Sequence, residues 1–289
     1  MLSISALKTR SRCTSDSLLT DRNMKLFCRR YGEGPPLIIL HGLYGSSDNW
    51  VTIAKKISKS YTVYLPDLRN HGASPHSEVH DYDSMSDDLL EMASEKGLNR
   101  FFLAGHSMGG KTAVRFTMKW PEMIMGLLVA DISPFETKSE TSGPYREHTA
   151  ILNALRDVNI TGAVSRTEIE KMLEGSIKSI RVRDFLLKNI RRNDDGSFDW
   201  KINHIALFNN LDKITGSAIS SSGVIAPITG FPVIFLKGEE SEYLPEEHFG
   251  RILSLFPAAE FRIIRNAGHW LHADNPDAVS EAFFSLAGE

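Results

Sequence analysis

The stretch FFLAGHSMGGKTAV, residues 101–114, places one serine among glycines, after an apolar run and before a helical pattern. Its centre, GHSMG at 105–109, fits G-x-S-x-G, in which the serine lies on a tight turn from a strand into a helix. Glycines flank the serine because side chains there would collide with neighbouring strands. Ser107 is therefore either a nucleophile or a small residue in a Gly-rich bend, and a nucleophile requires a base and an acid elsewhere in the chain.

From Met24 onward, short β-rich runs alternate with helical patterns. The first run, MKLFCRRYG at 24–32, predicts an edge strand. Further strands are expected at 37–42, 61–67, 100–105, 125–133, 232–238 and 260–266, and helices at 49–59, 82–97, 108–119, 245–255 and 273–286. Repeated strand–helix–strand units predict an α/β fold with a mostly parallel central sheet and helices on both faces.

The stretch 135–228 has helical patterns but no convincing buried strand. We interpret it as a helical cap inserted into a core made of residues 24–134 and 229–289. Ligands of open α/β sheets bind at the carboxyl ends of the strands. A cap over that edge would shape a pocket.

Residues 1–23 are rich in Ser, Thr, Lys and Arg, and their first acid is Asp16. They predict either an organellar transit peptide or a disordered extension, and translation could also begin at Met24. The expected location is cytoplasmic, or mitochondrial or another organelle if this segment is a transit peptide.

Composition excludes several classes of protein. The formal net charge of −3 and the lack of a basic block give no support for nucleic-acid binding. Only Cys13 and Cys28 occur, too few for a disulfide scaffold and without zinc-ligand spacing. No apolar run approaches the roughly 18 residues of a membrane span. We expect a small-molecule substrate, no cofactor and no metal, and the sequence leaves the oligomeric state open.

The segment LHGLYGSSDNW, residues 40–50, follows an earlier strand and offers free backbone amides. We expect the amides of Leu43 and Met108 to form an oxyanion hole, since Met108 begins the helix after Ser107. His41 is more readily structural than catalytic. The candidates for the substrate pocket are His41, Tyr44, His106, Trp200 and Trp270.

The base is expected last in the chain, in NAGHWLHADNPD at 266–277. His269 lies in the loop after the final strand, and the preceding glycine lets the chain turn toward Ser107. His272 is interpreted as a loop residue or a support, because a metal pair with His269 lacks a third ligand.

The acid is harder to identify from the sequence, because Ser241 stands where an aspartate usually follows the strand at 232–238. One strand earlier, the apolar run in LLVADISP at 127–134 ends in Asp131, which lies 24 residues after Ser107. A carboxylate at the end of an apolar strand is costly without a partner, and a protonated histidine would supply one. Asp131 is therefore the predicted acid, and Glu240 is the alternative.

One further loop, PDLRNHGASPHS at 66–77, follows another strand. Its polar side chains are expected to organise the loop beside the site. Direct catalytic roles for Arg69, His71 or His76 are the lesser alternative.

The segments HGLYGSSDNW, DLRNHGASPHS, GHSMGGK, ADISP and GHWLHADNP together resemble the α/β-hydrolase superfamily over nearly everything after residue 24. More narrowly, they resemble a branch of small serine esterases and thioesterases with bacterial members and mitochondrial relatives. The resemblance implies cofactor-free hydrolysis of short to medium acyl esters and thioesters. It carries the nucleophile and base onto Ser107 and His269, and the acid onto Asp131.

Other activities on the same three residues stay open. These are a cofactor-free perhydrolase and a C–C or lactone hydrolase. From a different class, a non-catalytic ligand receptor on this fold could keep all three residues. Haloalkane dehalogenase chemistry is disfavoured, because it needs a carboxylate where Ser107 stands.

Overall fold

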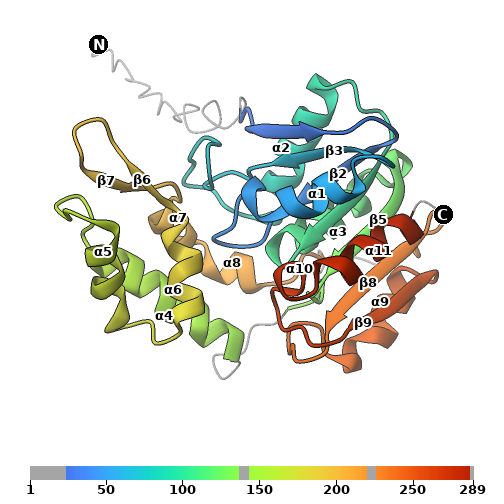
Figure 1. Cartoon of the computed structure of the whole chain (residues 1–289). Coiled ribbons are helices and arrows are strands. Elements are labelled where there is room, and N and C mark those ends of the chain that lie inside the picture. The colour runs from blue at the N-terminus through green and yellow to red at the C-terminus, as the bar shows by residue number, and fades with distance from the viewer. Residues whose placement is uncertain (1–23, 137–142, 220–225, 287–289) are drawn as a thin grey trace, which may run out of the picture.

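The computed structural model describes residues 24–136, 143–219 and 226–286, so the predictions for residues 1–23 lie outside the described residues. Its centre is a seven-stranded sheet in the order β1-β3-β2-β4-β5-β8-β9, in which only β1 runs antiparallel to its neighbour (Figure 1). The strands are β1 Cys28–Tyr31, β2 Pro36–Leu40, β3 Thr62–Pro66, β4 Phe101–His106, β5 Ile124–Ala130, β8 Val233–Gly238 and β9 Ala259–Ile264. The expected mostly parallel sheet is therefore confirmed.

Helices cover both faces of this sheet. The core helices are α1 Val51–Ile57, α2 Tyr82–Glu95, α3 Met108–Lys119, α9 Phe249–Leu255, α10 Leu271–Asp274 and α11 Pro276–Leu286, with short 3-10 helices η2 Ser47–Trp50, η3 Pro121–Met123 and η4 Glu246–His248. Alternate residues of each central strand point to opposite faces. In β2, Ile38 therefore packs with the side chains of α2 and α3, while Ile39 packs with those of α1 and α11. Burial on both faces explains the continuous apolar runs of the strands.

The segment between β5 and β8 forms a separate layer, at the left of Figure 1. It contains α4 Gly143–Asp157, α5 Arg166–Glu174, α6 Ile180–Leu187, α7 His204–Asn209 and α8 Leu211–Thr215. It also contains a hairpin, β6 Ile190–Arg192 with β7 Phe198–Trp200, which the helical interpretation did not include. Three-residue strands are too short to show the alternation of apolar and polar residues that marks a strand. The only signal in the sequence is the Asp-Gly pair at 195–196, where Gly196 makes the turn with φ 87°.

Hydrogen bonds join this layer to the core. The backbone amide of Asn203 donates to the Asn70 carbonyl at 2.9 Å, and Asn189 Nδ2 donates to the Tyr44 carbonyl at 2.8 Å. On α3, Lys111 Nζ donates to the Gly216 carbonyl at 2.7 Å. These contacts hold the layer over the carboxyl ends of the core strands. Within the described residues, no helix has the length and apolar character needed to cross a bilayer.

Candidate active site

The turn at Ser107 has a strained backbone, with φ 53° and ψ −122°. A Cβ on Gly105 would lie 2.1 Å from the Gly109 carbonyl oxygen, and one on Gly109 would lie 2.5 Å from that of His41. Glycine is thus required at 105 by the first turn of α3 and at 109 by the end of β2. A hydrogen bond from the Ser107 amide to the Ala130 carbonyl, 3.0 Å long, helps to hold the turn.

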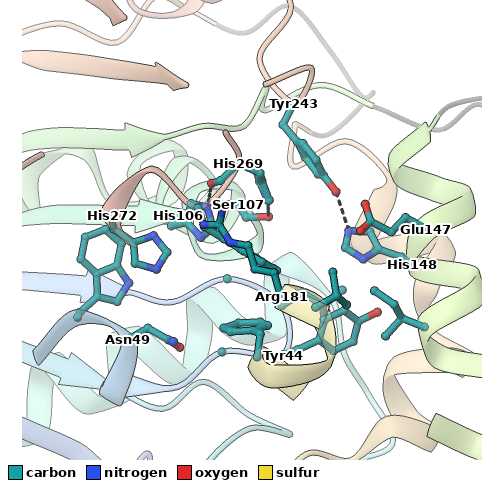
Figure 2. A pocket seen from close by; sticks show the side chains of 18 residues that line it. Tyr44, Asn49, His106, Ser107, Glu147, His148, Arg181, Tyr243, His269 and His272 are labelled. Carbon is teal, nitrogen blue, oxygen red and sulfur yellow. Dashed lines mark hydrogen bonds between the residues drawn. The ribbon is translucent and has the colours of Figure 1, made fainter. Parts of the chain in front are cut away.

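Three polar side chains from different strand ends form one hydrogen-bonded chain. Ser107 Oγ, directly after β4, lies 3.0 Å from His269 Nε2, in the loop between β9 and α10. His269 Nδ1 lies 2.8 Å from Asp131 Oδ2, directly after β5. Asp131 is fully buried (0% exposed), and Ser107 and His269 line a cavity (Figure 2). A hydroxyl in contact with an imidazole that a buried carboxylate orients is the arrangement of an activated nucleophile.

The carboxylate of Asp131 has further donors. The Gly238 amide donates to Oδ1 at 2.8 Å, and Ser241 Oγ donates to Oδ2, the oxygen that also faces His269. The residue that stands where an aspartate usually occurs therefore binds the aspartate of the neighbouring strand. Glu240 is exposed, and its backbone amide donates to the Ala267 carbonyl.

Two aromatic rings enclose the imidazole of His269. Tyr243 stacks on it with ring centroids 3.5 Å apart and planes 14° apart. The ring of His106 lies 4.7 Å away, and its Nε2 is 2.7 Å from the His269 carbonyl. Burial lowers the pKa of His106 well below its usual value, so this ring is neutral.

Tyr243 is itself held at three points. Its amide donates to Ser241 Oγ at 3.2 Å, and its carbonyl accepts from the Ser133 amide at 2.9 Å. Its hydroxyl lies 3.4 Å from Nε2 of His148, a residue of α4. Tyr243 and His148 could not be predicted from the sequence, because only the folded chain brings them to Ser107.

The cavity over Ser107 has a volume of about 190 Å³. The core contributes residues from the loop after β2, including Tyr44, and from the histidine loop, including Trp270. The layer between β5 and β8 contributes three apolar side chains and three polar or charged ones, namely Ile151, Val182, Phe185, Glu147, His148 and Arg181. A mostly apolar wall with a few polar groups is typical of a small-molecule pocket.

Two expected pocket residues do not line this cavity. His41 is buried behind it, where Nε2 accepts from the Leu68 amide at 2.9 Å and Nδ1 lies 2.8 Å from the Gly42 carbonyl. Trp200 lies on β7 and lines a different cavity together with His204. The remaining candidates, Tyr44, His106 and Trp270, do line it, as does His272, which stacks on Trp50 at 4.8 Å.

The loop at 66–77 has structural contacts. Arg69 forms a buried, two-pronged ion pair with Asp88 of α2, with distances of 2.6 and 2.7 Å. His71 Nε2 accepts from the Tyr44 amide at 3.3 Å, and Nδ1 lies 2.9 Å from the Arg69 carbonyl. His76 Nε2 lies 3.3 Å from the Lys201 carbonyl. None of the three lines the cavity over Ser107, and His71 supports the residue after Leu43.

A further contact links α6 to the histidine loop. Arg181 of α6 forms an ion pair with Asp274, and its guanidinium lies 4.8 Å from the ring centroid of Trp270. Asp274 Oδ2 also accepts from the amide of Gly268, the residue before His269, at 3.0 Å. One carboxylate thus contacts both the layer between β5 and β8 and the loop that carries His269.

The fold and this site define the class of the protein. A family model of the alpha/beta hydrolase fold matches residues 35–276, and the chain belongs to this family. Among curated proteins, the chain is 34% identical over 274 residues to the sn-1-specific diacylglycerol lipase ABHD11 of Danio rerio, covering 92% of this chain and 83% of the relative. It is 31% identical over 247 residues to Esterase YbfF of Escherichia coli, covering 86% and 91%.

A solved structure gives the same assignment. A marine microorganism esterase superposes with a TM-score of 0.87 at 42% sequence identity, covering 91% of this chain and all of that chain. The resemblance to a hydrolase branch with bacterial relatives is therefore confirmed at the level of the family.

Proposed function

We propose that this protein is a serine hydrolase that cleaves carboxylic esters or acyl-thioesters through Ser107, His269 and Asp131. The observation that carries the proposal is the hydrogen-bonded chain of 3.0 and 2.8 Å from Ser107 Oγ through His269 to the buried Asp131. Relatives described as esterases and lipases support an ester as the bond that is cleaved.

In the proposed reaction, His269 Nε2 takes the proton of Ser107 while Oγ attacks the carbonyl carbon. The protonated imidazole then gives this proton to the departing alcohol or thiol, which leaves an acyl-serine. Water attacks the acyl-serine with His269 again as the base, and the acid and free Ser107 are released. Asp131 would orient the imidazole and stabilise its charged form.

Backbone amides would bind the oxyanion of the tetrahedral intermediate. Met108 is the first residue of α3, so its N–H has no partner within that helix. Within the described chain, neither Leu43 nor Met108 donates its amide to a protein acceptor. Both residues lie beside Ser107, since Leu43 lines the same cavity and Met108 a small adjoining one that Ser107 also lines.

The cavity supports short to medium acyl chains. A cavity of about 150 Å³ with an apolar lining takes up benzene, so about 190 Å³ has room for a ring or chain of similar size. The aliphatic and aromatic side chains of the wall favour an uncharged acyl chain over a charged group.

Labelling and turnover test the proposal together. The wild-type chain should react with a fluorophosphonate probe at Ser107 and cleave p-nitrophenyl esters, with a maximum at short to medium chain length. Ser107→Ala should lose the label and about 10⁴-fold or more in kcat. S-acyl analogues of the best ester would measure thioesterase activity. Absence of both labelling and turnover on every ester would refute a hydrolase.

We propose a cytoplasmic location, with an organelle as the alternative. Fluorescent fusions of the full chain and of a chain beginning at Met24 would distinguish these locations. If only the full chain enters an organelle, residues 1–23 act as a transit peptide.

A further inference from the structure

Buried polar atoms without a partner are concentrated at one cavity. Among the described residues, six buried side-chain nitrogen or oxygen atoms have no hydrogen-bond partner in the protein. Two of them, Arg183 Nε and Trp200 Nε1, lie outside the cavity over Ser107. The other four belong to residues that line it, and they are Tyr44 Oη, Trp50 Nε1, His148 Nδ1 and His272 Nδ1. Because buried polar groups are nearly always paired, this concentration calls for a reason.

Tyr44 is held from two sides through its backbone. It is 4% exposed, and its backbone is in the left-handed region with φ 60°. Its amide donates to His71 Nε2 at 3.3 Å, and its carbonyl accepts from Asn189 Nδ2 at 2.8 Å. The residue is thus fixed from the core and from the cap layer, with the phenol in the wall of the cavity.

The ring of His148 lies beside this phenol. The two rings have centroids 5.7 Å apart and planes at 59°. His148 Nε2 faces the Tyr243 hydroxyl at 3.4 Å, which leaves Nδ1 as the nitrogen without a partner. Burial lowers the pKa of His148 to about 3, so the ring is neutral and has one donor and one acceptor nitrogen. The neighbouring wall contains the apolar side chains of Ile151, Val182 and Phe185 and the carboxylate-bearing Glu147.

We propose that Tyr44 Oη and His148 Nδ1 form a subsite for a hydrogen-bonding oxygen of the substrate. The substrate is then an ester or thioester that carries a second oxygen function, such as a hydroxyl, a ketone or another ester. This inference rests on the proposed hydrolase function and names its substrate class. In Figure 2, His148 and His272 lie on opposite sides of Ser107, so the subsite serves one arm of the substrate.

The energetic consequence is selectivity against plain alkyl esters. An apolar pocket discriminates weakly against an added hydroxyl. A site whose buried polar groups require a partner rejects an analogue that lacks one by as much as 10⁴–10⁵-fold. Since Tyr44 and His148 already exist as a fixed pair, the oxygenated ester should have the higher kcat/KM.

Paired substrates and the Tyr44→Phe variant test this. For the acyl arm, p-nitrophenyl 3-hydroxybutanoate is compared with p-nitrophenyl butanoate. For the alcohol arm, 2-hydroxyethyl butanoate is compared with ethyl butanoate. The wild type should prefer the oxygenated member of one pair at least tenfold in kcat/KM, and Tyr44→Phe should reduce this ratio at least tenfold. Tyr64→Phe, which removes a phenol hydroxyl on β3 outside the cavity, should keep it.

Thermal unfolding of the free protein gives a second measurement. Tyr44→Phe removes a buried hydroxyl without a partner, so Tm should rise by about 2 to 4 °C. Equal rates within both pairs, or a ratio that Tyr44→Phe does not change, would overturn the subsite, even if Tm rises. Such a result leaves the hydrolase proposal intact, because that proposal fails only if neither member of any pair is cleaved.

Discussion

At the scale of single residues, the hydrogen bond between Ser241 and Asp131 explains why a serine stands where an aspartate usually follows the strand at 232–238. Asp131 accepts hydrogen bonds from the Gly238 amide and Ser241 Oγ and contacts His269 Nδ1, so both oxygens of the buried carboxylate have partners. With Asp131 held by these donors, the proposed triad needs no second acid after β8. The sequence could predict Asp131 from the cost of burying it, but the hydrogen bond from Ser241 depends on the approach of two loops.

The first prediction separates the two candidate acids. Asp131→Asn should lower kcat about 10⁴-fold, because the amide would favour the wrong tautomer of His269. Glu240→Gln is the matched control, and it should keep wild-type turnover, since Glu240 is exposed. Steady-state kinetics on one p-nitrophenyl ester measures both, and the opposite ranking would assign the acid to Glu240.

The second prediction concerns the ring that stacks on His269. Replacing Tyr243 by Leu removes an aromatic face 3.5 Å from the imidazole, where a positive charge forms during turnover. An aromatic contact of about 0.5–1.5 kcal/mol corresponds to a loss of roughly two- to thirteenfold in kcat, with little change in KM. Tyr243→Phe keeps the stack and should restore most of kcat. Equal losses in the Leu and Phe variants would instead indicate that the hydroxyl matters.

Among the elements, those with strong apolar patterns could be predicted, and those that depend on tertiary contacts could not. The strands around GHSMG lie where continuous apolar runs predicted them, because burial on both faces requires such runs. The expected final helix is divided into α10 and α11 by Asn275, whose Oδ1 accepts from the Ala278 amide at 3.2 Å. The hairpin β6–β7 gave no periodic signal because each strand has only three residues.

The third prediction uses a contact between two elements. Lys111 of α3 is 1% exposed and donates to the carbonyls of Thr215 and Gly216 at the end of α8. Burial lowers the pKa of Lys111 to about 7. Between pH 7 and about 10, the unfolded chain binds a proton that the folded chain does not, so the contribution of Lys111 to stability rises with pH.

Urea denaturation at pH 7, 8 and 9 measures this effect. The free energy of unfolding of the wild type, relative to that of Lys111→Met, should increase with pH by up to about 1.4 kcal/mol per pH unit. Lys119→Met removes a partly exposed lysine of the same helix and should give curves parallel to the wild type. If the free energy of unfolding of Lys111→Met depended on pH in the same way as that of the wild type, the amine of Lys111 would keep its proton in the folded protein.

For the whole molecule, the sequence predicted the core better than the pocket. Ser107, His269 and Asp131 follow strand ends, which are readable, whereas His148 and Arg181 come from α4 and α6. Nothing in the helical patterns of the cap indicates which turn faces Ser107. The position of these side chains depends on how the cap packs against Asn70, Tyr44 and Asp274.

The fourth prediction follows from buried histidines throughout the molecule. Burial lowers the pKa of His80 and His148 to about 3 and that of His272 to about 4. As the pH falls below about 6.5, these residues gain protons in the unfolded chain but not in the folded chain. Each should therefore remove about 1.4 kcal/mol of stability per pH unit.

The free energy of unfolding should accordingly fall steeply between pH 6.5 and 5, before most carboxylates titrate. Urea denaturation at these two pH values measures the decrease. His80→Gln should reduce the slope of free energy against pH by about 1.4 kcal/mol per pH unit, which corresponds to one proton. A slope near zero in the wild type would mean that these rings are protonated in the fold or lie in contact with water.

The position of Asp131 has a consequence for how the protein can be altered. Nucleophile and acid both belong to one continuous β4-α3-β5 unit, and the cap enters the chain only after this unit is complete. Most of the cap, including the residues that line the cavity, should therefore be exchangeable for that of a related protein without moving Ser107 relative to Asp131. The contacts of the cap with Asn70, Tyr44, Lys111, Tyr243 and Asp274 would have to be rebuilt. The chain is in this sense modular, with its chemistry and much of its selectivity encoded in separate segments.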